Sequence, residues 1–333
     1  MKTSKRRISR DRKRRDSQSV QRLKWQRVVN PYPPFEILSA DQIEAIHQAS
    51  LEVLRDTGIK FLSQRARNVF RNAGAEIDDG QSIVKLDPTL VEELVSHTPD
   101  SFTLVARNLN RSIEMGGNNI NFATVGGPSF ISDLDGGRRN GTLEDLKRFF
   151  KIVHQLEIFH MGGASPFEPH ELPAETRHLD KYLTAITHHD KIWLSNMLGA
   201  YRACDGLRMR AIVHGIDLDQ PPDEVLTVGN ININSPRQVD ESMSDSLIEF
   251  ATMNQATLVT PFTLLGAMAP TTMAGALVQQ NAEALACIAL SQAVQKGAPV
   301  IYGSFSSNVD MKSGSPAFGT PEYVRTTLAS AQL

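Results

Sequence analysis

The sequence has no apolar run close to the roughly 20 residues that a bilayer-spanning helix needs, and no apolar stretch follows its charged N-terminus. This predicts a cytoplasmic protein without a membrane partner. Cysteine is scarce as well. Cys204 and Cys287 show neither paired nor metal-like spacing, so we expect two small buried thiols in a reduced compartment rather than a disulfide or a zinc site.

Several catalytic and nucleotide motifs are also missing. No Gly-x-Gly-x-x-Gly turn follows a predicted strand, and no Gly-x-x-x-x-Gly-Lys-Ser/Thr or His-Glu-x-x-His run occurs. A doubly wound nucleotide fold is therefore disfavoured. His188 and His189 stand beside Asp190 with no further ligand at suitable spacing, so we interpret them as surface features. The sequence predicts no metal site and identifies no catalytic acid, base or nucleophile.

The charge is unevenly distributed. Residues 1–27 hold twelve Lys and Arg against two Asp, a net charge of +10, so the rest of the chain carries −12 of the total of −2. Such a segment lacks the apolar side chains needed to offset its ordering entropy, so residues 1–30 are predicted to form a disordered basic arm. One interpretation is a non-enzymatic binder of nucleic-acid phosphates. We favour a solvated arm that contacts an acidic partner or the acidic body, because Trp25 is its only aromatic residue.

Residues 31–117 predict a small α+β cap. Ser39 and Gln42 form a capping-box pattern at the start of an apolar-faced helix that ends at Gly58. Further helices are predicted over 63–73 and 87–97, and strands over 102–105 and 112–115.

From residue 118 to 333 strands and helices alternate. The predicted strands are 120–125, 159–163, 192–197, 225–231, 257–265 and 300–302; the predicted helices between them are 142–156, 171–187, 200–213, 241–253 and 274–295. This spacing is typical of parallel strands with helical crossovers. The fold class is therefore α/β: a (β/α)8 TIM barrel with about six of its eight βα units present in this sequence.

Barrels of this class place their sites on the loops after the strands. The longest such loop is predicted at 303–319, and its Gly, Ser and Pro residues are interrupted by aromatic and charged side chains. Asp133 and Glu168, on two other loops, form a possible acid and base pair. They leave open a barrel lyase or hydrolase as an alternative function.

The segments Gly-Ser-Phe-Ser-Ser-Asn-Val-Asp-Met-Lys-Ser-Gly-Ser-Pro at 303–316 and Gly-Thr-Pro-Glu at 319–322 resemble the trimethylamine:corrinoid methyltransferase family. The stretches 51–59, 122–128 and 230–236 are similar too, so the resemblance runs from about residue 35 to the end. It implies a barrel, active in methylamine metabolism and methanogenesis, that presents a methylated amine to the Co(I) of a separate corrinoid protein. No cofactor would then be bound directly, and a homo-oligomer is left open.

The resemblance also bears on the substrate. Family members that act on trimethylamine contain pyrrolysine, whereas relatives that resemble glycine betaine methyltransferase lack it and take quaternary amines. The resemblance implies that the pyrrolysine position and two further βα units would follow Leu333. The absence of pyrrolysine from this sequence therefore does not distinguish trimethylamine from a quaternary amine as the substrate.

A quaternary ammonium is held best by aromatic faces, at about 0.5–2 kcal/mol per ring. The candidate rings are Tyr302, Phe305, Phe262, Phe130 and Phe167, each of which has core packing as its alternative role. A betaine carboxylate would be bound by Arg237 or Lys312, with hydrogen bonds from Asn232 and Asn234, unless these asparagines cap the turn beside Pro236. Asp310 would pair with the ammonium or with Lys312.

Overall fold

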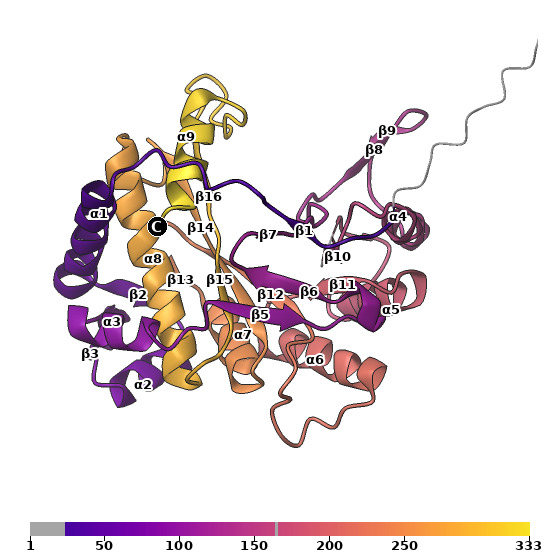
Figure 1. Cartoon of the computed structure of the whole chain (residues 1–333), viewed down its shortest axis with the longest axis horizontal. Coiled ribbons are helices and arrows are strands. Elements are labelled where there is room, and N and C mark those ends of the chain that lie inside the picture. Colours follow the sequence, from indigo (N-terminus) through magenta and orange to yellow (C-terminus); the bar gives the residue numbers. More distant parts are fainter. Residues whose placement is uncertain (1–23, 164–165) are drawn as a thin grey trace, which may run out of the picture.

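The computed structural model describes residues 24–163 and 166–333, so most of the predicted basic arm lies outside the described residues. The described chain is an α/β structure built on a parallel sheet (Figure 1). Its order is β10 (Met161–Gly162), β11 (Ile192–Ser195), β12 (Val228–Ile233), β14 (Ala256–Leu265) and β15 (Val300–Tyr302), with β16 (Phe305–Asn308) also paired to β14. Each strand thus lies beside the next strand of the predicted series. Among the described residues β15 pairs along β14 alone.

Helices connect these strands as predicted. They are α4 (Leu143–Gln155), α5 (Arg177–His188), α6 (Ala200–His214), α7 (Glu241–Thr252), α8 (Met273–Val294) and α9 (Pro321–Ser330). Local capping explains several starts: the side chains of Thr142, Asp240 and Thr320 each accept a hydrogen bond from a backbone N–H of the first turn. Helix α5 begins six residues later than predicted, because Pro173 forms a turn whose carbonyl accepts from the N–H of Arg177.

The predicted strand 120–125 does not form as one element. β7 (Asn119–Ile120) instead pairs antiparallel with β1 (Val28–Val29), and the parallel sheet is reached only at Ala123, which bridges Met161. A helix can be predicted from its local sequence because its backbone hydrogen bonds form within the same segment. A strand depends on partners, and here the N-terminal segment supplies one that the local pattern does not reveal.

The predicted helices of the cap are confirmed as α1 (Ala40–Glu52), which continues into the π-helical turn η1 (Val53–Thr57), α2 (Gln64–Asn72) and α3 (Pro88–Val95). Three short strands between them were not predicted: β2 (Ile59–Phe61), β3 (Glu76–Asp78) and β4 (Ile83–Lys85). They form a sheet of order β13-β2-β4-β3, in which β13 (Gln238–Val239) comes from the segment between β12 and α7. The cap is therefore joined by backbone hydrogen bonds to the connection that follows β12.

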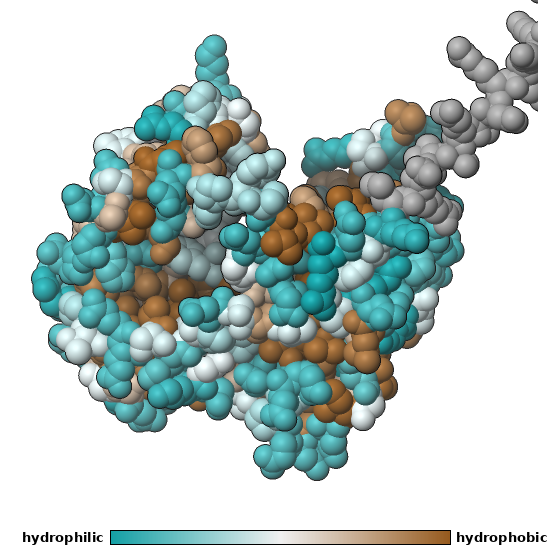
Figure 2. Space-filling view, viewed as in Figure 1, coloured by the Kyte–Doolittle hydropathy of each residue, from teal (hydrophilic) through white to brown (hydrophobic). Residues whose placement is uncertain are grey.

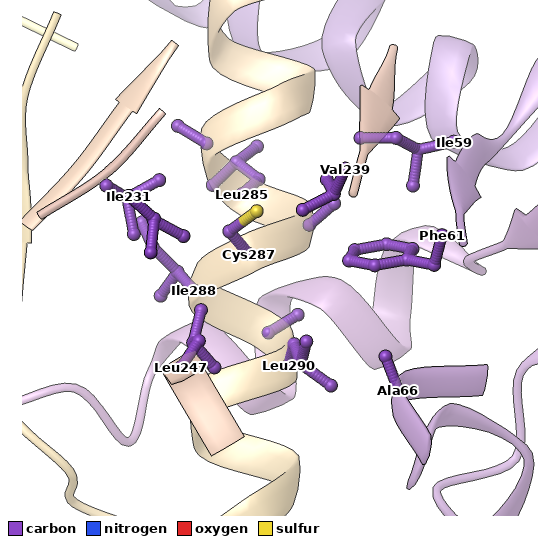
Figure 3. Close-up of a cluster of buried hydrophobic side chains, with 14 of the residues drawn as sticks. Ile59, Phe61, Ala66, Ile231, Val239, Leu247, Leu285, Cys287, Ile288 and Leu290 are labelled. Atoms are coloured by element: carbon purple, nitrogen blue, oxygen red, sulfur yellow. The ribbon is translucent and has the colours of Figure 1, made fainter. Parts of the chain in front are cut away.

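Helix α8 lies at the centre of the largest apolar core. Cys287 on this helix packs between Ile231 of β12 on one side and Phe61 and Val239 on the other (Figure 3). Both cysteines are free thiols. Cys287 is buried as expected, whereas Cys204 is half-buried, and burial raises the pKa of Cys287 far above its ordinary value. One continuous core thus includes cap and sheet residues.

The predicted hairpin is confirmed as β5 (Ser101–Leu104) and β6 (Ile113–Gly116), which pair antiparallel and flank the short 3-10 helix η2 (Leu109–Arg111). Leu104, bridged to Val225, and Ile113 pack in one buried cluster with Met161, Ile192, Val228 and Ala256, which stand at or near the first residues of the parallel strands. The hairpin therefore closes the N-terminal end of the sheet.

Residues 24–39 cross the molecule from the edge near β10 to α9 (Figure 1). His160 holds one end, because its Nε2 lies 3.0 Å from the carbonyl oxygen of Gln26, and the side chain of Gln332 binds the backbone of Ile37 and Leu38 at the other. A second hairpin, β8 (Ile131–Asp133) and β9 (Gly137–Arg139), projects beside α4. A search of the described residues finds no helix with the length and apolar content required to cross a bilayer.

Candidate functional site

The two faces of the parallel sheet differ in chemistry. Asn232 is in register with Thr260, and Phe262 with Phe305, so each pair lies on one face of neighbouring strands. The intervening residues Ile231, Ile233 and Val259 belong to the core around α8. The sheet face directed away from α8 therefore carries two amides, one hydroxyl and two aromatic rings. They belong to Asn230, Asn232, Thr260, Phe262 and Phe305. We call these five residues the polar-aromatic face.

The two phenylalanines of this face stack. The ring centroids of Phe262 and Phe305 are 4.6 Å apart with an interplanar angle of 13°, and Phe318 meets Phe305 edge-on at 5.2 Å. Both stacked side chains are half-buried. The prediction that Phe305 lies in a loop is wrong, because β16 continues the strand direction of β15 alongside β14. Two of the predicted ring candidates are thus brought together by a strand pairing.

The amides stand next to the rings. Thr260 Oγ1 donates to Asn230 Oδ1 at 2.9 Å, which orients that amide, and Asn232 is exposed on the same face. Gly303 lies beside them, where a Cβ atom would come within 2.8 Å of Leu258 Cδ1 and 3.1 Å of Thr260 Oγ1. Only glycine fits there without displacing these side chains. Asn230, Thr260 and Gly303 were not among the predicted site residues, although the period-two alternation of residues 228–233 was a usable signal.

The other asparagine has a structural role. Asn234 Oδ1 accepts from the backbone N–H of Asp240 at 3.2 Å, immediately before α7. Its own N–H donates to the carbonyl of Gln238. The turn-capping alternative considered for the asparagines therefore describes Asn234, and not Asn232.

Tyr302 lies on the opposite side of the sheet from Phe305. Its hydroxyl is 3.3 Å from both Gln280 Nε2 and Asn281 Oδ1 on α8, and it packs against the core around that helix. Burial raises the pKa of Tyr302 far above its ordinary value. The predicted aromatic set is thus divided, because Tyr302 faces helix α8 whereas Phe262 and Phe305 face away from it.

Arg237 is also turned away from the polar-aromatic face. It follows the cis peptide bond Ser235-Pro236 with a left-handed φ of 51°, and its Nη1 donates to the carbonyl of Gly58 in the cap at 3.1 Å. The buried Glu283 of α8 holds this turn by accepting from Ser235 Oγ at 2.6 Å and from the N–H of Arg237 at 2.7 Å. Burial raises the pKa of Glu283.

Asp310 and Lys312 form an exposed turn after β16. Asp310 accepts from the backbone N–H of Lys312 at 3.1 Å and from Ser313 Oγ at 2.7 Å, and the Ser313 hydroxyl lowers the pKa of Asp310. Asp310 therefore meets the backbone of Lys312. No ion pair joins the two side chains in the described part of the chain.

The carboxylates of the alternative function belong to separate ion-pair networks. Asp133 binds Arg139 and the N–H of Gly136, and both partners lower the pKa of its carboxyl, with Gly136 the larger contribution. Glu168 binds Lys181 Nζ at 2.8 Å. Asp133, stabilised in its charged form, is a poor proton donor or acceptor near neutral pH.

The remaining candidates lie apart from the stacked pair. Phe130 stacks on His170, and Phe167 is buried against Phe149.

Burial lowers the pKa of His189 to about 3, so this residue is a neutral core histidine rather than the surface group expected. Residues 24–163 and 166–333 contain no cluster of His, Cys, Asp and Glu suited to a metal ion.

The space-filling view shows the surface hollowed between the part that carries α9 and the part that carries the β8–β9 hairpin (Figure 2). The stacked rings and the amides lie on the parallel sheet toward the carboxyl ends of its strands, the end at which α/β folds commonly bind ligands.

Comparison with known proteins assigns the family. The family described as Trimethylamine methyltransferase (MTTB) matches residues 3–333. The glycine betaine methyltransferase of Desulfitobacterium hafniense (strain Y51) is 36% identical over 301 residues, which cover 90% of this chain and 62% of that protein. The trimethylamine methyltransferase MttB of the same species (strain DSM 10664 / DCB-2) is 32% identical over 288 residues, 85% of this chain and 57% of that protein.

The proline betaine:corrinoid methyltransferase of Eubacterium limosum is 24% identical and is matched over 89% of this chain and 62% of its own length. The chain thus spans about three fifths of the length of the curated relatives that it matches. It belongs to the trimethylamine methyltransferase family, which confirms the resemblance stated from the sequence.

Proposed function

We propose that this protein is a methyltransferase that moves a methyl group from a methylated amine, bound at the polar-aromatic face, to the Co(I) of a corrinoid protein. The stacked pair Phe262 and Phe305 carries this proposal. A quaternary ammonium has no N–H group and no lone pair, so hydrogen bonds cannot hold its nitrogen. The faces of aromatic rings, which carry negative charge, attract it instead.

Among methylated amines we propose a quaternary amine of the glycine betaine type, with trimethylamine as the alternative. The relative that is 36% identical is named glycine betaine methyltransferase. Asn232 is exposed on the same face as the rings, where its amide can donate to a carboxylate. Arg237 and Lys312 are less suitable, because the first is directed to the cap and the second stands on an exposed turn.

The proposed reaction is an in-line displacement. The N–CH3 bond breaks, its electron pair stays with the amine nitrogen, and the cobalt supplies the pair for the new bond to carbon. The amine leaves neutral, so no protein acid or base is required. The residues of the polar-aromatic face would orient the methyl group and exclude water, which accounts for a site of rings and amides. The corrinoid is the acceptor substrate, carried by a partner protein.

We also propose that the parallel sheet forms part of a (β/α)8 barrel, with residues 31–117 as its cap and 118–333 as barrel. The sequential order of neighbouring parallel strands supports this, since a barrel requires that order throughout. The greater length of the relatives leaves room for further βα units in the family.

A methyl-transfer assay tests the function. The protein is mixed with a corrinoid protein in the Co(I) state and with glycine betaine or trimethylamine, and the loss of Co(I) absorbance is followed. We expect transfer from at least one amine, and its loss in the Phe262→Ala/Phe305→Ala variant. Binding of neither amine by calorimetry would contradict the proposal independently of the choice of corrinoid protein.

A further inference from the structure

A concave site lies apart from the residues of the polar-aromatic face. It is a cavity of about 480 Å³ between the cap and the connection after β12. The end of η1, strand β2 and the β3–β4 turn form one wall, and residues 236–238 form the other. Its volume is within the range of small-molecule sites, roughly 300–1,000 Å³.

The charge of this cavity has one sign. Lys60 and Arg237 line it, and none of its lining residues is acidic. Neither cation has a carboxylate within ion-pair distance in the part of the chain that the structure describes. Asp56 binds Arg55, and Asp79 binds Arg67 and Arg71, whereas Asp78 accepts from the N–H of Gln81 in the cavity wall. Glu283 meets the backbone of Arg237 behind the turn.

Three hydrogen bonds hold Arg237 in place, two made by its backbone and one by its side chain. Its N–H donates to Glu283, its carbonyl accepts from the N–H of Lys60 at 2.9 Å, and its Nη1 donates to the carbonyl of Gly58. These bonds hold a left-handed backbone conformation that an arginine rarely adopts. A guanidinium fixed in this way has little side-chain entropy left to lose on binding a ligand.

We propose that this cavity binds a small oxyanionic compound, through a phosphate or carboxylate group paired with Arg237 and Lys60. Arginine presents several N–H donors in a planar fork that matches both groups, and the lysine adds a second positive charge. Leu62, Ile83 and Pro236 supply apolar wall for the rest of such a ligand. This site is separate from the proposed methyl transfer, because its residues face the cap.

Calorimetric titration with inorganic phosphate and with succinate, at constant ionic strength set by sodium chloride, tests the proposal and distinguishes the two sources. We expect one of these anions to bind, and its affinity to fall at least about tenfold, or about 1.4 kcal/mol, in Lys60→Gln/Arg237→Gln. Arg237→Lys should be intermediate, since it keeps the charge and loses the fork. The matched control is Lys151→Gln/Lys296→Gln, which removes two exposed lysines outside the cavity.

A second measurement does not depend on the folding of a variant. Phenylglyoxal modifies accessible arginines, and mass spectrometry of the wild-type protein reports each site. The bound anion should protect Arg237 and leave the exposed Arg148 unprotected. Equal loss of affinity in both double variants would overturn the proposal, as would equal protection of both arginines or no binding of either anion up to about 10 mM.

Discussion

The two ends of one sheet face have opposite compositions. Toward the N-terminal ends of the strands this face presents Val228, Ala256 and Leu258, which pack with the β5–β6 hairpin. Two to four residues further along the same strands it presents Asn230, Asn232, Thr260 and Phe262. The hairpin closes the first end, and the surface near the second is hollowed (Figure 2).

This contrast separates stability from function along a single strand. Apolar side chains covered by the hairpin stabilise the fold because their surface is removed from water, and this requires no specific partner. The amides and stacked rings at the other end are less completely buried in the core, so they can contact a ligand. Substitutions at the closed end should therefore change the free energy of unfolding, and substitutions at the other end should change ligand affinity.

The largest effect is expected at the closed end. Leu104 is fully buried in the hairpin cluster, so Leu104→Ala should lower the free energy of unfolding by about 2–5 kcal/mol. Urea denaturation measures this loss. Leu109, in the same hairpin connection, is 71% exposed, and Leu109→Ala should change stability by less than about 0.5 kcal/mol. Similar losses in both variants would mean that the hairpin does not close the sheet.

The next effect is expected at the polar-aromatic face. An ammonium can lie over the outer face of one ring of the stacked pair, so Phe262→Ala/Phe305→Ala should remove about 0.5–2 kcal/mol of cation–π attraction and lower the affinity for glycine betaine at least about twofold. Titration calorimetry provides the measurement. Phe130→Ala is the control, because Phe130 stacks on His170 away from this pair. Unchanged affinity in the double variant would contradict binding of the amine at these two rings.

Substitution of Tyr302 tests whether the two faces of the sheet have different roles. Tyr302→Phe removes the hydroxyl that meets Gln280 and Asn281, so stability should fall by about 0.5–1.5 kcal/mol. Affinity for the amine should stay within about twofold of the wild type, since the ring faces α8. A large loss of affinity with intact stability would show that Tyr302 belongs to the binding site after all.

The smallest effect is expected at the alternative acid and base pair, Asp133 and Glu168. Asp133 is stabilised in its charged form, and displacement by Co(I) requires no protein proton transfer, so the transfer rate of Asp133→Asn should match the wild type within about twofold from about pH 6 to about pH 9. A bell-shaped pH profile that this substitution abolishes would favour the lyase or hydrolase alternative.

Much of the fold could be predicted because its signals are local. The side chains of Ser39, Thr142 and Asp240 cap helices within their own sequence neighbourhood, and the alternation of strands and helices predicted a parallel sheet. The short strands β2, β3 and β4 were missed because each is three residues long and depends on partners elsewhere in the chain.

The candidate site was predicted only in part. The sequence indicated Phe262, Phe305 and Asn232, but treating residues 303–319 as a loop hid the strand that β16 forms. With that strand, Tyr302 and Phe305 stand an odd number of residues apart, and alternation alone puts them on opposite faces. The direction of Arg237 could not be predicted, since a left-handed turn held by the distant Glu283 decides it.

A crystal structure of the protein soaked with glycine betaine tests the central claim most directly. We predict that the trimethylammonium group lies within about 6 Å of the Phe262 or Phe305 ring centroid, with the carboxylate toward Asn232. Density for the ligand on the α8 side of the sheet, or none at the polar-aromatic face under saturating ligand, would contradict it.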